Sequence, residues 1–184
     1  MPRYLALLRG INVGGHNKLA MADLRDVASA LGHTDVATYI QSGNLVFTST
    51  AVDASSLADA LELEISGRLG VAPAVVVISK AELAQVIADN PFPDEVNPKS
   101  LHAVFRRDAV NKNDIDDIAR AVRRARESGS RDDAVAIGRT LYLRTPDGLG
   151  RSDLAAQLAR SKVQSAGTAR NWATVTKLMA MLGE

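Results

Sequence analysis

The chain of 184 residues has no cysteine, which excludes disulfides, thiolate metal sites and a cysteine nucleophile. Aromatic residues make up only 4% of the sequence, so aliphatic side chains must fill any core. No segment approaches the roughly 18 apolar residues of a membrane-spanning helix, and the N-terminus lacks the apolar stretch of a signal peptide. We therefore expect a cytoplasmic protein that makes no membrane contact.

Catalytic machinery is also missing from the sequence patterns. There is no H-E-x-x-H motif, no cluster of metal ligands and no pair of carboxylates within one motif, so we predict no metal and no cofactor and assign no catalytic residue. The net charge of +1 is too small to indicate nucleic-acid binding by itself. What remains is an ordinary globular composition, with 46% hydrophobic and 23% charged residues.

The first half of the chain alternates between strand and helix patterns. Short apolar runs predict strands, and apolar residues at helical spacing, closed by Gly32 and Gly70, predict helices. The resulting order, β-α-β-β-α-β, is typical of ferredoxin-like sheets. The predicted strands are 4–8, 36–41, 45–48 and 75–78, and the predicted helices are 21–31 and 56–69, the second opened by Ser56 with Asp59.

This order predicts which loops meet. Crossovers between parallel strands are right-handed, so strands one and two should be parallel with strand three between them. The loop 9–18 and the turn 41–44 should then lie at the same edge of the sheet.

A break at Asn90-Pro91-Phe92-Pro93 predicts a boundary between a lobe at 1–90 and a lobe at 91–184. The second lobe is predicted to contain a strand, a helix, a hairpin, a short helix and a C-terminal helix that Thr168 caps and in which Trp172 faces the core. No fourth strand is evident in it. The fold class is thus α+β with two small lobes, the first ferredoxin-like and the second a related β-α-β-β-α unit plus a C-terminal helix.

Three motifs together resemble a known family. They are Leu7-Leu8-Arg9-Gly10-Ile11-Asn12-Val13-Gly14-Gly15, Thr38-Tyr39-Ile40-Gln41-Ser42-Gly43-Asn44 and Thr168-Ala169-Arg170-Asn171-Trp172. On these residues the chain resembles the DUF1697 family, bacterial proteins of unknown function. The resemblance implies an α+β structure of two small lobes and carries over no activity.

The loop 9–18 is the strongest candidate for a binding site. Amides around Gly14 and Gly15 at the start of a helix would favour an anion, and Arg9 and Lys18 would add positive charge. Asn12 would add directional hydrogen bonds. The alternative is a tight strand-to-helix connection that needs glycine only for its shape.

The other two motifs offer polar side chains. Gln41, Ser42 and Asn44 surround a hairpin turn, which alone would explain Gly43 and Asn44, and Ser42 has no evident base to make it a nucleophile. Arg170 and Asn171 begin the third motif, where Arg170, Thr174 and Lys177 would share one face of the last helix. That face would meet a ligand or only water.

We expect these residues to bind a phosphate-bearing ligand, either a nucleotide or a nucleic-acid backbone. The alternative is an enzyme acting on a small polar metabolite, and a third hypothesis is a module that binds a protein partner. Aromatic residues are too few and dispersed for the base-stacking strands of an RNA-recognition domain. The sequence leaves the oligomeric state open.

Overall fold

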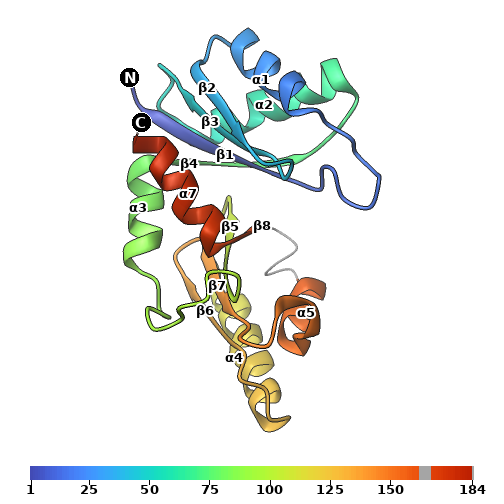
Figure 1. Cartoon of the computed structure of the whole chain (residues 1–184), viewed down its shortest axis with the longest axis vertical. Coiled ribbons are helices and arrows are strands. Elements are labelled where there is room, and N and C mark those ends of the chain that lie inside the picture. The colour runs from blue at the N-terminus through green and yellow to red at the C-terminus, as the bar shows by residue number, and fades with distance from the viewer. Residues whose placement is uncertain (162–166, 184) are drawn as a thin grey trace. The chain divides into compact units, whose positions relative to one another are not determined.

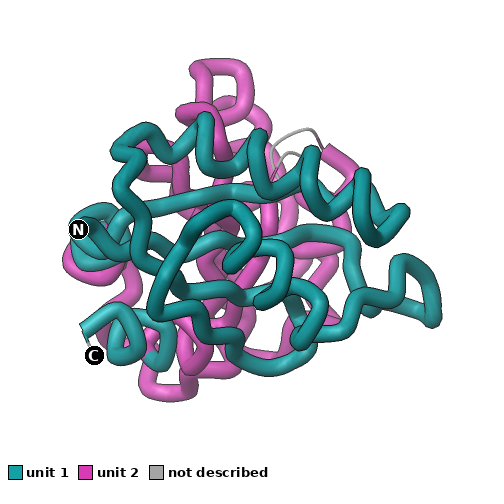
Figure 2. The backbone as a smooth tube through the Cα atoms, turned by 90° about the horizontal axis from the view of Figure 1, so that it is seen from above, with its two compact units in different colours: residues 1–85, 177–184 teal, residues 86–176 magenta. Residues whose placement is uncertain are grey.

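The computed structural model describes residues 1–161 and 167–183. The chain divides into two compact units, Met1–Gln85 with Lys177–Glu184, and Val86–Thr176. Figure 2 colours the two units separately. Each has its own sheet with helices, as the α+β prediction of two lobes requires.

Unit 1 contains a four-stranded antiparallel sheet in the order β2-β3-β1-β4. Strand β3 pairs with both β1 and β2, so β1 and β2 run parallel to each other with β3 between them, as the sequence predicts. This is the ferredoxin-like arrangement. The strands are β1 (Arg3–Arg9), β2 (Thr34–Tyr39), β3 (Asn44–Thr48) and β4 (Ala74–Ser79).

Helices α1 (Met21–Ala30) and α2 (Ala54–Leu69) cover one face of this sheet (Figure 1). Alternate strand residues such as Leu8, Leu45 and Phe47 pack with the apolar faces of the two helices in one buried cluster. Strand residues that point to the other face, Leu5 and Leu7 among them, are buried as well. The sheet is therefore a rigid support for the loops at its ends.

The helix ends in unit 1 follow local sequence signals with one correction. Asp53, not Ser56, caps α2, because its carboxylate accepts a hydrogen bond from the backbone N–H of Ser56 at 2.8 Å. Ser79 and Glu82 form the reciprocal hydrogen bonds of a capping box at the start of α3 (Lys80–Ala88). Helix α3 begins in unit 1 and ends in unit 2.

Unit 2 repeats the topology of unit 1, with a four-stranded sheet in the order β6-β7-β5-β8. The prediction of three strands was incomplete. Residues 167–171 form a fourth strand, which pairs antiparallel with β5. The strands are β5 (Leu101–Arg106), β6 (Asp133–Ile137), β7 (Thr140–Arg144) and β8 (Gly167–Asn171).

Helices α4 (Lys112–Glu127) and α5 (Asp153–Arg160) bury their apolar faces against residues such as Val104 and Leu141. A short 3-10 helix, η1 (Leu149–Arg151), precedes α5, and α7 (Trp172–Gly183) follows β8 and continues into unit 1. None of the helices in the described residues has the length and apolar content needed to cross a bilayer.

Candidate functional site

The loop after β1 and the turn between β2 and β3 meet at one edge of the sheet in unit 1. Leu7 pairs with Asn44, and the N–H of Leu8 donates to the carbonyl of Gly43 at 2.8 Å. The predicted convergence is therefore confirmed. We call the surface formed by residues 9–18 and 40–44 the loop edge; the loop is the segment that extends beyond the sheet after β1 in Figure 1.

Asn12 ties the two segments of the loop edge together. Its side-chain amide donates to the carbonyls of Leu19 and Gln41, each at 2.9 Å, and its side-chain oxygen accepts from the N–H of Leu19 at 2.9 Å. Its φ of 54° is left-handed, a conformation that asparagine tolerates better than most residues. Both polar atoms of the Asn12 side chain therefore form hydrogen bonds within the fold. Asn12 fixes the positions of its neighbours.

The two adjacent glycines of the loop form a hairpin tip. Gly14 and Gly15 have φ values of 58° and 80°, and the N–H of His16 donates to the carbonyl of Val13 at 3.1 Å. Two positive φ values inside such a four-residue turn define type I′ geometry, which favours glycine at both positions. The geometry of this turn is sufficient to explain both glycines. This is the alternative given above, in which the loop needs glycine only for its shape.

The turn between β2 and β3 has one buried and two exposed polar side chains. Asn44 is fully buried, and its amide donates to the carbonyl of Tyr39 and the hydroxyl of Ser42, both at 2.9 Å. Gln41 and Ser42 are exposed. Of the three residues predicted here, Asn44 supports the turn from inside while Gln41 and Ser42 lie at the surface.

Gly43 is required by its surroundings. Its φ is 75°, and a Cβ atom placed on it would lie 2.7 Å from Cβ of Leu8 and 2.8 Å from Cδ1 of Ile11. No side chain fits there without moving β1 or the loop. The two segments of the loop edge therefore approach each other as closely as backbone and core side chains allow.

Ile40, the first residue of the turn after β2, has a left-handed φ of 48°, which is unfavourable for a β-branched residue. Its side chain is 50% exposed, so burial does not offset the strain. Val13 in the loop is 69% exposed. Neither residue was predicted from the sequence, because an isolated aliphatic side chain in a loop does not reveal that it is exposed.

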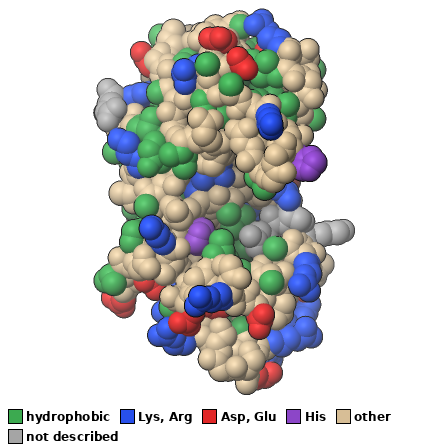
Figure 3. All heavy atoms as spheres, turned by 45° about the vertical axis from the view of Figure 1, so that its right-hand side comes forward, with side chains coloured by type: hydrophobic (Ala, Val, Ile, Leu, Met, Phe, Trp, Pro, Cys, Tyr) green, Lys and Arg blue, Asp and Glu red, His purple; other side chains and the backbone are tan. Residues whose placement is uncertain are grey.

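The loop edge carries positive charge without acidic residues close to it in the chain. Arg9, His16 and Lys18 are all exposed. Residues 1–22 and 36–52 contain no aspartate or glutamate. Elsewhere on the face shown in Figure 3, acidic side chains lie among the basic ones, and the net charge is only +1. The positive charge at the loop edge is therefore a local feature.

The remaining predicted residues, Arg170 and Asn171, lie in unit 2 and not in the last helix. Both belong to β8, so the predicted helical face that joins Arg170, Thr174 and Lys177 is wrong. Asn171, rather than Thr168, caps α7, since its side-chain oxygen accepts from the N–H of Thr174 at 2.9 Å.

Arg170 is buried at 7% exposure, with its guanidinium donating to the hydroxyl of Thr168 at 2.7 Å and to the carbonyl of Ala169 at 2.8 Å. Burial lowers the pKa of Arg170 to about 10. The guanidinium nevertheless remains charged near neutral pH, held in place by strand β8.

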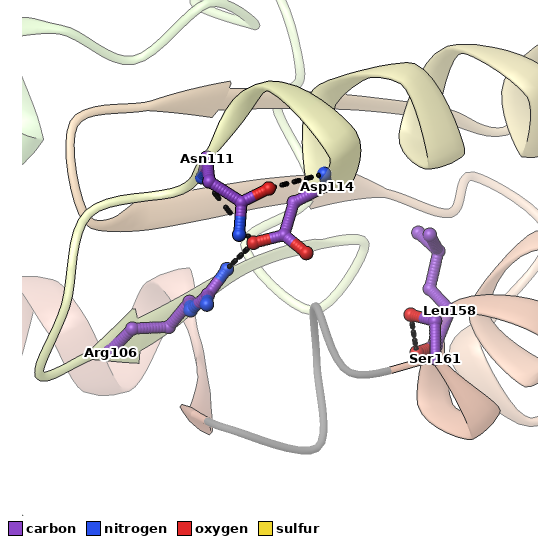
Figure 4. A network of polar contacts seen from close by, with 5 residues as sticks. All are labelled: Arg106, Asn111, Asp114, Leu158 and Ser161. Atoms are coloured by element: carbon purple, nitrogen blue, oxygen red, sulfur yellow. Dashed lines mark hydrogen bonds and ion pairs between the residues drawn. The ribbon is translucent and has the colours of Figure 1, made fainter.

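A buried ion pair in unit 2 was not anticipated (Figure 4). Arg106, at the end of β5, donates to the carboxylate of Asp114 at 3.0 Å, and both side chains are nearly inaccessible. Asp114 also completes a capping box with Asn111 at the start of α4. The spacing Asn111-x-x-Asp114 was the available signal. The carboxylate of Asp114 therefore bonds to groups that hold β5 to α4, which is a structural role.

Nothing in the described residues provides a metal site, since no three His, Asp or Glu side chains there gather closely enough to hold an ion. Arg9 and Lys18 give the loop edge two exposed cations, which attract an anion rather than a cation. A ferredoxin-like unit, followed along the chain by a second unit of the same topology, defines the class of this protein.

Comparison with known proteins agrees with that class. The chain belongs to the family described as "Protein of unknown function (DUF1697)", whose profile matches residues 1–142. No curated protein matches the sequence. Among solved structures, the chain is similar to the conserved bacterial protein SP0830 from Streptococcus pneumoniae, with a TM-score of 0.75, 23% identity, and 98% of each chain covered. At that identity the similarity concerns the fold alone.

Proposed function

We propose that unit 1 binds a phosphate-bearing ligand, a nucleotide or a nucleic-acid backbone, at the loop edge. The observation that carries the proposal is the positive charge of Arg9 and Lys18 in a region whose neighbouring sequence lacks carboxylates. Neither Arg9 nor Lys18 forms a salt bridge with any carboxylate of the described residues. Their charge is available to an anion.

The rigidity of the loop supports the same proposal. Asn12 fixes the loop to the turn through one side-chain hydrogen bond to Gln41 and holds the loop itself through two to Leu19, and Gly43 lets the two segments approach closely. Cations on a fixed support lose less conformational entropy when a ligand binds. In this arrangement Arg9 and Lys18 contact the phosphate, and Gln41 and Ser42 hydrogen-bond the rest of the ligand.

The test is a thermal-shift series with inorganic phosphate, ATP and a short single-stranded oligonucleotide, at about 50 mM and about 300 mM salt. We expect a rise in Tm with one of these compounds that is lost in the variant R9A/K18A. The control is R68A, which removes an exposed arginine of α2 that pairs with Glu64. A rise that persists in R9A/K18A would contradict the proposal.

The salt dependence separates the two ligand classes. A nucleic-acid backbone releases counterions, so each phosphate contact contributes about one unit to the slope of log affinity against log salt. A nucleotide held by two cations gives a shallower slope.

A protein partner at the same edge is the second candidate. The observation in its favour is the exposure of Val13 and Ile40, at 69% and 50%. Exposed apolar side chains beside charged ones are common where proteins meet. A flat ligand screen with the wild-type protein would favour this candidate over the first.

A further inference from the structure

An apolar groove of about 590 Å³ runs along unit 2 between α4 and β6. Strand β6 is the end strand of its sheet, and α4 contributes Ile115, Ala119 and Val122 at spacings of four and three residues. These residues form one stripe along the helix. Ile115 is 49% exposed, so the residues that the structure describes leave part of the stripe uncovered.

The free edge of β6 is poorly suited to pairing with another strand. The N–H of Ala134 donates to the side chain of Asp133 at 2.9 Å, and Asp133 forms an ion pair with Arg126 at 2.6 Å. A charged pair at a strand end is a usual protection against strand addition. The groove therefore fits a helix better than a strand.

The charges along α4 indicate which helix would occupy the groove. Its first half carries Asp116 and Asp117, and its second half carries Arg123, Arg124 and Arg126. The helix dipole alone favours acidic residues near the start of a helix and basic residues near its end. The dipole does not explain why an apolar groove lies beside these charges. An antiparallel copy of the same helix places the half that contains Asp116 and Asp117 against the half that contains Arg123 and Arg124, whereas a parallel copy places like charges opposite each other.

We propose that this groove is the interface of a symmetric dimer, in which α4 packs antiparallel to α4 of a second copy of this chain. Asp116 then faces the partner's Arg123, and Lys112 faces the partner's Glu127. Both pairs are symmetric about the peptide bond between Ala119 and Arg120. Ala119, a small residue on the groove side, lets the helices approach closely at the axis.

Sedimentation equilibrium between about 1 µM and about 200 µM tests the proposal, because a dimer whose dissociation constant lies in this range dissociates measurably across it. We expect the mass to rise from that of the 19.5 kDa chain to twice that value. A monomer throughout the range would overturn the proposal.

Variants locate the interface. D116R removes two intermolecular pairs per dimer and should raise the dissociation constant about tenfold or more. D116R/R123D exchanges the charges and should restore the dimer. A119E places a charge at the axis and should abolish it, while D26R, on exposed α1, should have no effect. Dimers that persist in both A119E and D116R, or a double variant that fails to recover although its circular dichroism is native, would overturn this interface.

Discussion

Asn12 shows how much of the loop edge depends on one side chain. In the variant N12D, a carboxylate oxygen replaces the amide that donates to the carbonyls of Leu19 and Gln41. Two donated hydrogen bonds are lost and like partial charges face each other, so the free energy of unfolding should fall by about 1–3 kcal/mol. Urea denaturation measures this change.

The control for N12D is N97D. Asn97 is exposed and its side chain accepts a hydrogen bond from the N–H of Lys99, which an aspartate retains. N97D should change the stability by less than about 0.5 kcal/mol. Equal stabilities of the two variants would mean that the hydrogen bonds of Asn12 do not hold the loop.

His102 gives the stability a pH dependence. It lies in β5 with Nδ1 buried and without a hydrogen-bond partner among the described residues, and burial lowers its pKa below the usual 6.5. At a pH just below 6.5, His102 therefore binds a proton in the unfolded chain but not in the folded chain. Because stability rises with pH wherever the unfolded state binds more protons, it should fall as the pH drops below about 6.5.

Urea denaturation between about pH 7.5 and 5.5, above the range in which carboxylates titrate, measures this effect. H102N should reduce the slope of stability against pH, and the remainder includes His33, whose pKa burial also lowers. NMR titration of the His102 ring checks the cause directly. A midpoint at or above 6.5 would rule out His102 as the source.

Among the elements, β8 is the one that the sequence did not predict. It begins with Gly167, on which a Cβ atom would lie 2.7 Å from the backbone oxygen of Phe105 and 2.7 Å from Cγ1 of Val104. G167A forces β8 away from β5 and should reduce the stability by about 1–3 kcal/mol. G150A is the control, because a Cβ there meets nothing within 4 Å.

Thermal unfolding compares the two alanine variants. G150A should unfold within about 1 °C of wild type, and G167A should unfold several degrees lower. If both variants unfold together with wild type, β8 is not held against β5 as closely as its pairing implies.

At the scale of the whole molecule, the sequence predicted the first sheet because β1, β3 and β4 are built around apolar runs and Gly43 marks the turn between β2 and β3. It failed at β8, where Thr168-Ala169-Arg170-Asn171 has no apolar alternation and leads directly into a helix. That strand forms because β5 offers a free edge, which is tertiary information.

For the candidate site, the sequence predicted the position in the fold but not the orientation of each side chain. Topology brought the loop and the turn together, as predicted. Composition could not predict which polar side chains point inward. The amides of Asn12 and Asn44 donate to groups within the fold. The side chains left at the surface are Arg9, Lys18, Gln41 and Ser42.

The C-terminal part of α7 belongs to unit 1, because the residues from Lys177 onward group with the first residues of the chain. Leu178 and Leu182 of α7 are each only 1% exposed. A chain that ends at Lys177 loses both, at roughly 1.5–3 kcal/mol for each buried leucine. A chain that ends at Leu182 keeps both and is the control.

Hydrogen exchange shows where that stability is lost. In the chain that ends at Lys177, exchange should accelerate in β1, although β1 lies at the opposite end of the sequence. In the control it should match wild type. If β1 keeps its protection while only unit 2 exchanges faster, the C-terminal residues stabilise unit 2 instead, and the N-terminal unit stands without them.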